Sequence, residues 1–318
     1  MKGAAHRARA CDRKGGRHNM FGILNVNKRA GWTSRDVVNR VHRFVRPEKA
    51  GHAGTLDPLA TGVLVVAVGQ ATRLIQYAHR LPKSYRAKFL LGRRSASDDV
   101  DTELERLDAA PIPSPAQIEA ALPRFLGEIQ QRPPAFSAVS VQGQRAYKLA
   151  RRGDEVTLTP RPITIHSLNL AFYEYPELVL DIRCGSGTYV RALGRDLAES
   201  LQTAAVLAAL ERTEIGSLEV SAGVDVDQIE NRIQELLLPP RLLIEALPWI
   251  SLTQDEIQEL HFGRTVNPTG RQVQPPTWPG ESDSAEIAGL DEDGRVLSIL
   301  QATETGAFRP LSNLPRSD

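Results

Sequence analysis

The apolar positions of this chain repeat with the periods of both strands and helices. Residues 21–27 alternate like a strand, residues 63–68 form the continuous apolar run of a buried strand, and residues 83–91 also read as a strand. Between the first two strands, Thr33 and Asp36 have the spacing of a capping box. One apolar stripe follows, and it predicts a helix: Val37, Val38, Val41 and Val45.

Strands and helices continue to alternate along the rest of the chain. We predict helices over residues 71–80, 188–201 and 227–237, and strands over 163–173 and 178–184. Ser114-Pro115 begins another helix, because proline suits the first helical position, and its inward residues are Ile118, Leu122, Phe125 and Leu126. Regular βαβ spacing is absent, so the pattern favours an α+β class. The pair Pro239-Pro240 and the step Pro248-Trp249 mark a boundary before a small, mostly β unit over residues 250–315.

Composition excludes several classes of protein. The chain has 318 residues, of which 41% are hydrophobic and 24% charged, which is typical of a globular protein and not of a disordered or collagen-like one. No apolar run approaches the roughly 20 residues of a membrane span. The two cysteines, Cys11 and Cys184, lie far apart, so we expect neither a disulfide framework nor a zinc site, and we expect a cytoplasmic location.

Charge is distributed unevenly although the net charge is only +1. Residues 1–20 form a basic tail without a secretory signal, and both Met1 and Met20 are candidate translation starts. Residues 248–318 are acidic, with 11 acidic and 5 basic side chains. Two acid-free basic runs, 80–94 and 131–152, contain aromatic residues, and this combination favours nucleic acid over a plain solvated face.

The most unusual local sequence is Gly51-His-Ala-Gly-Thr-Leu-Asp-Pro-Leu-Ala-Thr-Gly62. Its glycines allow a ligand to approach the backbone closely, and Asp57 can serve as a nucleophile or a general base. A tight turn capped by Asp57 is the structural alternative. A second acidic segment, residues 98–105, reads as a surface loop, and a divalent-metal loop is disfavoured because the calcium-loop spacing is missing.

This motif resembles the signature of the TruB family of pseudouridine synthases. Further motifs of that family occur in the same order over residues 21–216: Gly31-Trp-Thr-Ser34, Lys83-Ser-Tyr-Arg86, Gln131-Arg-Pro-Pro-Ala-Phe-Ser-Ala138, Gly143-Gln-Arg-Ala-Tyr147, Gly187-Thr-Tyr-Val-Arg191 and Leu210-Glu-Arg-Thr213. The chain departs from the family pattern at Asn27, Arg29, Gln202, Val206 and Glu211; Gln202 stands where a glycine is expected.

The resemblance implies a fold and a domain division. We expect a catalytic domain over residues 21–247 with a mixed, largely antiparallel sheet flanked by helices, a small PUA-like domain over 248–318, and a tail over 1–20 outside the fold. It implies that the enzyme isomerises a uridine in the T loop of tRNA, at position 55, to pseudouridine. Isomerisation adds no atom, so no cofactor and no metal are expected. The expected ligand is the tRNA T stem-loop, and the protein is expected to be a monomer without an obligate protein partner.

The resemblance also assigns the site residues. Asp57 is the catalytic carboxylate, Arg191 pairs with it, and Tyr85 stacks on the target base and helps to remove its C5 proton. Substrate contacts are expected from Leu210, His52, Tyr189 and Lys28. Without the motif, Tyr85 reads as a packing residue, Arg191 as a surface ion pair and His52 as a turn residue. Two other functions remain open: a non-catalytic RNA-binding protein, and a glycosidase or nucleosidase, which would need a second catalytic acid.

Overall fold

The computed structural model describes residues 20–137, 140–141, 144–145, 158–230, 232–278 and 285–315. Residues 1–19 of the predicted tail and Tyr147 lie outside these residues, whereas Met20, the last residue of the tail, packs against the core of the fold. Within them, nine strands form one large sheet: β1 (Gly22–Lys28), β2 (Ala50–Ala53), β3 (Thr61–Val68), β4 (Lys83–Leu91), β7 (Gly127–Gln131), β10 (Arg161–Glu174), β11 (Glu177–Cys184), β12 (Ala205–Ile215) and β13 (Leu218–Glu219).

The order in this sheet is β1-β3-β12-β4-β11-β10-β7, with β2 at β3 and β13 at β12. All pairs are antiparallel except β3 with β12, which is parallel. A second sheet contains β14 (Trp249–Ser251), β15 (Glu286–Leu290), β16 (Val296–Ala302) and β17 (Phe308–Asn313). The short strands β5 (Arg93–Arg94) and β6 (Glu105–Arg106) form one ribbon, and β8 (Ser140–Val141) and β9 (Gln144–Arg145) another. The predicted α+β class with a mixed, largely antiparallel sheet is confirmed.

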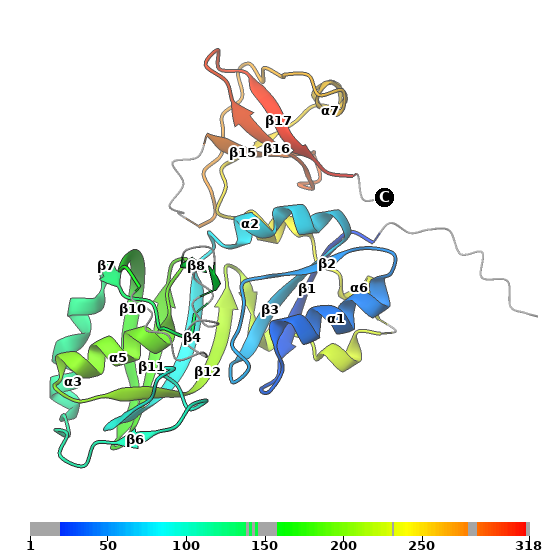
Figure 1. Ribbon diagram of the computed structural model, residues 1–318. Coiled ribbons are helices and arrows are strands. Elements are labelled where there is room, and N and C mark those ends of the chain that lie inside the picture. The colour runs from blue at the N-terminus through cyan, green and yellow to red at the C-terminus, as the bar shows by residue number, and fades with distance from the viewer. Residues whose placement is uncertain are drawn as a thin grey trace, which may run out of the picture.

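Helices cover both faces of the large sheet (Figure 1). The α-helices are α1 (Ser34–Val45), α2 (Ile75–Ala78), α3 (Pro115–Ala121), α5 (Val190–Ser200), α6 (Ile233–Leu236) and α7 (Gln254–His261). Short 3-10 turns occupy Gly69–Leu74, Leu122–Phe125, Val220–Ala222, Val226–Gln228 and Pro240–Leu243. None of the described helices has the length and apolarity needed to cross a membrane.

Several sequence predictions hold residue by residue. Thr33 caps α1 with a complete capping box, and the four valines of the predicted stripe are buried. Ser114 caps α3 in the same way. The inward prediction for Leu126 is wrong, because the backbone becomes extended there and the side chain is exposed. The helix predicted over residues 227–237 is only a 3-10 turn and the four-residue α6.

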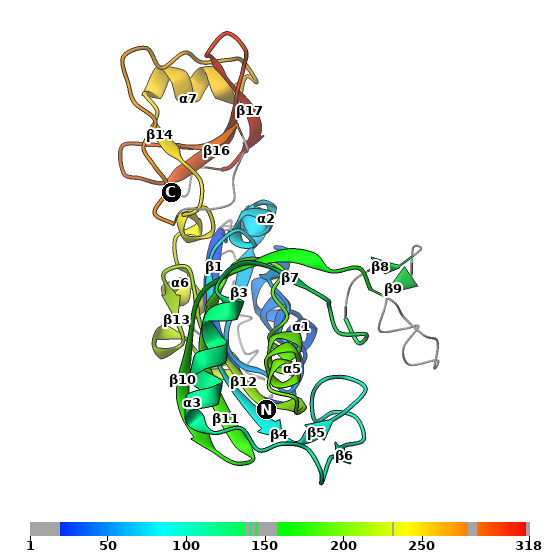
Figure 2. The same ribbon diagram turned by 90° about the vertical axis from the view of Figure 1, so that its left-hand side faces the viewer.

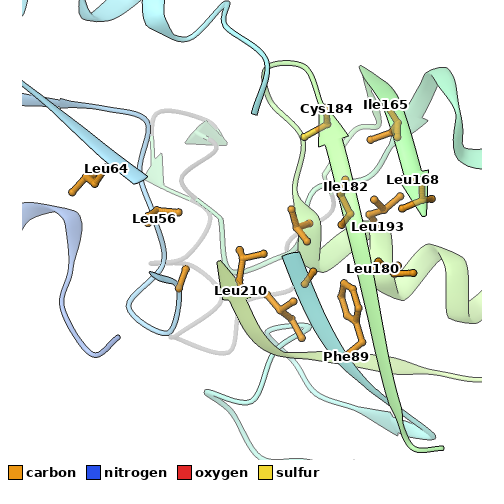
Figure 3. Close-up of a cluster of buried hydrophobic side chains, with 14 of the residues drawn as sticks. Leu56, Leu64, Phe89, Ile165, Leu168, Leu180, Ile182, Cys184, Leu193 and Leu210 are labelled. Atoms are coloured by element: carbon orange, nitrogen blue, oxygen red, sulfur yellow. The ribbon is translucent and has the colours of Figure 1, made fainter. Parts of the chain in front are cut away.

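Strand β3 is buried on both faces, which explains its continuous apolar run. Leu64 and Val66 face the core shared with α1, α3 and α5, whereas Val63 and Val65 face a second core. Figure 2 shows α3 and α5 together on one side of the sheet. Figure 3 draws part of the first core, with Leu180 and Ile182 on β11 and Leu64 on the β3 side.

The second core joins the large sheet to the small one. It includes Leu74 and Tyr77 from the region of α2, and Leu290 and Ile299 from β15 and β16. The small sheet stands above α2 in Figure 1. A salt bridge of 2.8 Å between Arg80 and Glu286 crosses the same junction. The small sheet is therefore packed against the main body through apolar and charged contacts.

Candidate active site

The loop that carries Asp57 is held by hydrogen bonds on both sides of this residue. The Ser34 hydroxyl accepts from the Leu56 N–H at 2.9 Å and donates to the Leu56 carbonyl at 3.1 Å. The Pro58 carbonyl accepts from the backbone N–H of Gly31 at 2.8 Å. These bonds fix the backbone before and after Asp57, while its carboxylate remains 38% exposed. The carboxylate is thus rigidly placed and still accessible.

Arg191, in the first turn of α5, binds two carboxylates at once. Its guanidinium lies 3.2 Å from Asp57 Oδ2 and 3.1 Å from Asp99 Oδ2, and it donates to the carbonyls of Ser97 and Phe136 at 2.8 and 3.0 Å. Only 8% of the Arg191 side chain is exposed. A buried guanidinium needs such partners, because desolvating an unpaired charge is costly. Arg191 is therefore not the surface ion pair that a lone helical arginine suggests.

The acidic segment that reads as a surface loop turns inward at its beginning. Asp99 is 4% exposed and belongs to the Arg191 cluster, and Asp98 forms a 2.7 Å salt bridge with Arg195. Asp98 has a φ of 59°, which an aspartate tolerates better than most residues. The surface-loop prediction is therefore wrong for these two residues: their carboxylates are the counter-charges of arginines on α5. Among the described residues, no group of three or more potential ligands is placed to hold a metal ion.

A cavity of about 330 Å³ opens beside Asp57. Five of the seven predicted site residues line it: Asp57, Tyr85, Tyr189, Arg191 and Leu210. They come from the Asp57 loop, β4, the start of α5 and β12, segments far apart in the sequence. This volume is at the lower end of the range for small-molecule pockets, about 300–1,000 Å³. The cavity thus combines an accessible carboxylate, aromatic rings and an aliphatic side chain.

Tyr85 is partly buried on β4. Burial raises the pKa of its phenol, and the positive charge of Arg212 opposes that rise. A tyrosine with a raised pKa is neutral at neutral pH, since the ordinary value is about 10. The ring can therefore pack against an apolar ligand without a charge of its own.

His52 and Lys28 do not line the cavity. The Nδ1 atom of His52 is buried without a hydrogen-bond partner, and burial lowers the pKa of the imidazole, with Arg212 and Arg35 adding to the effect. Lys28 is 1% exposed, and its amine donates to the Trp32 and Pro58 carbonyls at 2.6 and 3.3 Å. Burial lowers the pKa of Lys28 to about 8, although the charge of Asp57 raises it. The structure thus places Lys28 behind the Asp57 loop.

Sequence reasoning missed two residues of this site. Asp99 was hidden in an acidic run that resembles solvated surface. Arg212 lies two positions after Leu210, so the period of two along a strand places both side chains on one face, and both line the cavity. That signal was present in the sequence, but it becomes informative only once residues 205–215 are known to form a strand.

Comparison with known proteins supports a single family. A family model described as "TruB family pseudouridylate synthase (N terminal domain)" matches residues 42–190. A tRNA pseudouridine synthase B of Microcystis aeruginosa is 39% identical over 259 residues, covering 80% of this chain and 87% of that protein. One of an Arthrobacter species is 38% identical over 298 residues, with 92% and 96% covered.

Solved structures agree at the level of the fold. A chain in the crystal structure of a Cbf5-Nop10-Gar1 complex superposes with a TM-score of 0.73 at 23% identity, covering 95% of this chain and 87% of that one. At this identity the match shows the fold alone. The identity to the curated relatives over most of both chains goes further: this chain belongs to the TruB family of pseudouridylate synthases.

Proposed function

We propose that this protein converts the uridine at position 55, in the T loop of tRNA, to pseudouridine, with Asp57 as the catalytic carboxylate. The observation that carries the proposal is the pairing of an accessible Asp57 with the buried Arg191 in the wall of a cavity of about 330 Å³. The names of the curated relatives, all tRNA pseudouridine synthase B, support tRNA as the substrate.

In the proposed reaction the N1–C1′ bond of the uridine breaks and a C5–C1′ bond forms. The hydrogen on C5 leaves and N1 gains one, so the product is an isomer of the substrate. Asp57 drives the bond cleavage, and Arg191 holds its carboxylate in place through their ion pair. Both groups are already in contact, at 3.2 Å.

The target base has to leave the RNA stack, because it cannot turn over between its neighbours. We propose that Tyr85 stacks on the extruded uracil and that Leu210 packs against it; both line the cavity. Tyr189, the N-cap residue of α5, also lines the cavity. His52, outside the cavity, would occupy the space that the base leaves in the T loop. Lys28 would support the Asp57 loop from behind rather than touch the RNA.

The remaining parts of the proposal concern partners and location. We propose that the T stem-loop of tRNA is sufficient for recognition, that the enzyme acts as a monomer without an obligate protein partner, and that it works in the cytoplasm with no cofactor. Sedimentation of the purified protein with and without tRNA tests the monomer, and a minimal T stem-loop RNA tests the recognition element.

Asp57→Asn is the variant that tests the proposed chemistry. It keeps the shape of the side chain but removes its charge and nucleophilicity, so we expect tritium release from C5-labelled tRNA to stop while filter binding of the same tRNA is retained. Asp181→Asn is the matched control, since Asp181 pairs with Arg86 at an exposed position of β11. Unchanged tritium release in Asp57→Asn would require another catalytic carboxylate.

Two results with the parental enzyme would replace the proposed function by another one. Release of free uracil by the parental enzyme would indicate a nucleosidase. Tight tRNA binding without any pseudouridine in the parental enzyme would indicate a binding protein. A tRNA that carries cytidine at position 55 tests the position: we expect no tritium release from it.

A further inference from the structure

Arg212 is a buried cation whose presence the proposed chemistry does not yet explain. Only 2% of the residue is exposed, and among the described residues no carboxylate lies within 4 Å of its guanidinium. Its Nε donates to the Val63 carbonyl at 2.8 Å, and another nitrogen donates to the Gly54 carbonyl at 3.1 Å. Arg191, in contrast, is neutralised by two carboxylates. A buried charge without a carboxylate partner is costly, so its position needs a reason.

The sheet register explains how Arg212 reaches this position. It pairs with Gly62 on the parallel strand β3 and with Tyr85 on the antiparallel strand β4. Gly62 has a φ of 95°, and a Cβ atom there would lie 2.2 Å from the Arg212 carbonyl oxygen. Only glycine therefore lets the strands approach this closely. Directly opposed residues of an antiparallel pair present their side chains on the same face, so Arg212 and Tyr85 are neighbours in the cavity wall.

The positive charge of Arg212 also acts on Tyr85. Among the charged groups near Tyr85, Arg212 has the largest influence, and it lowers the pKa of the phenol against the effect of burial. Arg212 also contacts the start of the Asp57 loop through the Gly54 carbonyl. One guanidinium thus bonds to the backbone of the Asp57 loop and lies beside Tyr85 in the cavity wall.

We propose that Arg212 is a positioning residue for Tyr85: it fixes the ring against the target base and holds a positive charge beside the phenol oxygen. This inference rests on the proposed function. Arg212 does not act as a phosphate anchor in this assignment, so its loss changes the chemical step and leaves RNA affinity nearly intact.

A double-mutant cycle between Arg212→Gln and Tyr85→Phe tests the inference with full-length protein. The measured quantities are the single-turnover rate of pseudouridine formation at saturating enzyme and the tRNA affinity. In the parental background, we expect Arg212→Gln to lower the rate by at least about tenfold, a coupling typical of residues in direct contact. In the Tyr85→Phe background, the same substitution should lower it by less than about threefold. Arg212→Lys, which keeps the charge, should recover part of the rate.

Lys28→Met serves as the matched control, because Lys28 is also a buried cation bonded to carbonyls at the Asp57 loop but lies outside the cavity. Its effect should be the same in both Tyr85 backgrounds. Equal losses for Arg212→Gln in both backgrounds would overturn the inference, as would a loss of affinity at an unchanged rate. If Arg212→Gln does not fold, Arg212→Lys completes the cycle, and its smaller rate loss should still be lower in the Tyr85→Phe background than in the parental one. Absence of pseudouridine with the parental enzyme would refute the proposed function itself.

Discussion

Asp99→Asn tests whether the second carboxylate on Arg191 contributes to the chemistry at Asp57. The substitution keeps the shape of the side chain and its acceptor oxygen, which receives hydrogen bonds from the Ser97 hydroxyl and the Asp101 N–H. It removes the charge that lies 3.1 Å from the guanidinium. Arg191 then retains Asp57 and two carbonyls.

These contacts set the expected losses in stability and in rate. Removing one partner of a buried ion pair typically costs about 3–5 kcal/mol, but Arg191 keeps a second carboxylate here, so we expect a loss of about 1–3 kcal/mol in the free energy of unfolding. The guanidinium nitrogen that faced Asp99 then keeps only the Ser97 carbonyl as a partner, so its position is less firmly held. A displacement of about 1 Å at a reacting group can reduce a rate about a hundredfold. We therefore expect single-turnover pseudouridine formation to fall by about 10- to 100-fold, with tRNA affinity unchanged.

The neighbouring Asp98→Asn provides the control. It makes the same chemical change one residue away, but Asp98 pairs with Arg195, which keeps Asp196 as a partner. Stability should fall modestly in this variant, and the rate should stay within about twofold. Denaturant unfolding and single-turnover assays on both variants separate the two effects. Equal rates for the two variants would refute the idea that Asp99 acts through Arg191.

Three further predictions concern charge, backbone and the junction between the sheets. Burial lowers the pKa of Lys28 from 10.5 to about 8, so between these pH values the unfolded chain binds one more proton than the folded chain. This group therefore makes the free energy of unfolding rise with pH by about 1.4 kcal/mol per pH unit. Lys28→Met should flatten that slope in unfolding measured from pH 8 to 10. Gln202 follows the C-cap of α5 with a φ of 59°, a backbone conformation that is strained for residues other than glycine. Gln202→Gly should therefore raise the melting temperature, with a gain of about 1 kcal/mol in the free energy of unfolding. A lower melting temperature would show that this backbone position is not strained. The Trp278 indole N–H donates to Glu245 at 3.1 Å, and the Arg183 guanidinium lies over the Trp278 ring. Trp278→Ala should therefore speed proteolysis between the two sheets without changing the single-turnover rate. Unchanged proteolysis would show that this contact is dispensable.

The sequence by itself determined the elements whose pattern is local. Strands β1, β3 and β4 and helix α1 follow from alternation, a continuous apolar run and a capping box, each read within about a dozen residues. The Asp57 motif was also a candidate site in the sequence, because its glycines bracket one carboxylate and the whole motif resembles the TruB signature. These features depend on interactions between near neighbours, which the order of residues expresses directly.

Only the tertiary structure decided β12 and what surrounds it. Residues 205–210 are apolar throughout and suit a helix as well as a strand; the slot between β3 and β4 makes them a strand. The same packing buries Arg212 beside Tyr85 and brings Asp99 to Arg191, turning residues with ordinary surface patterns into parts of the cavity or its support. Strand pairing and desolvation depend on which distant segments meet, and that choice is made by the free energy of the whole core rather than by any local stretch.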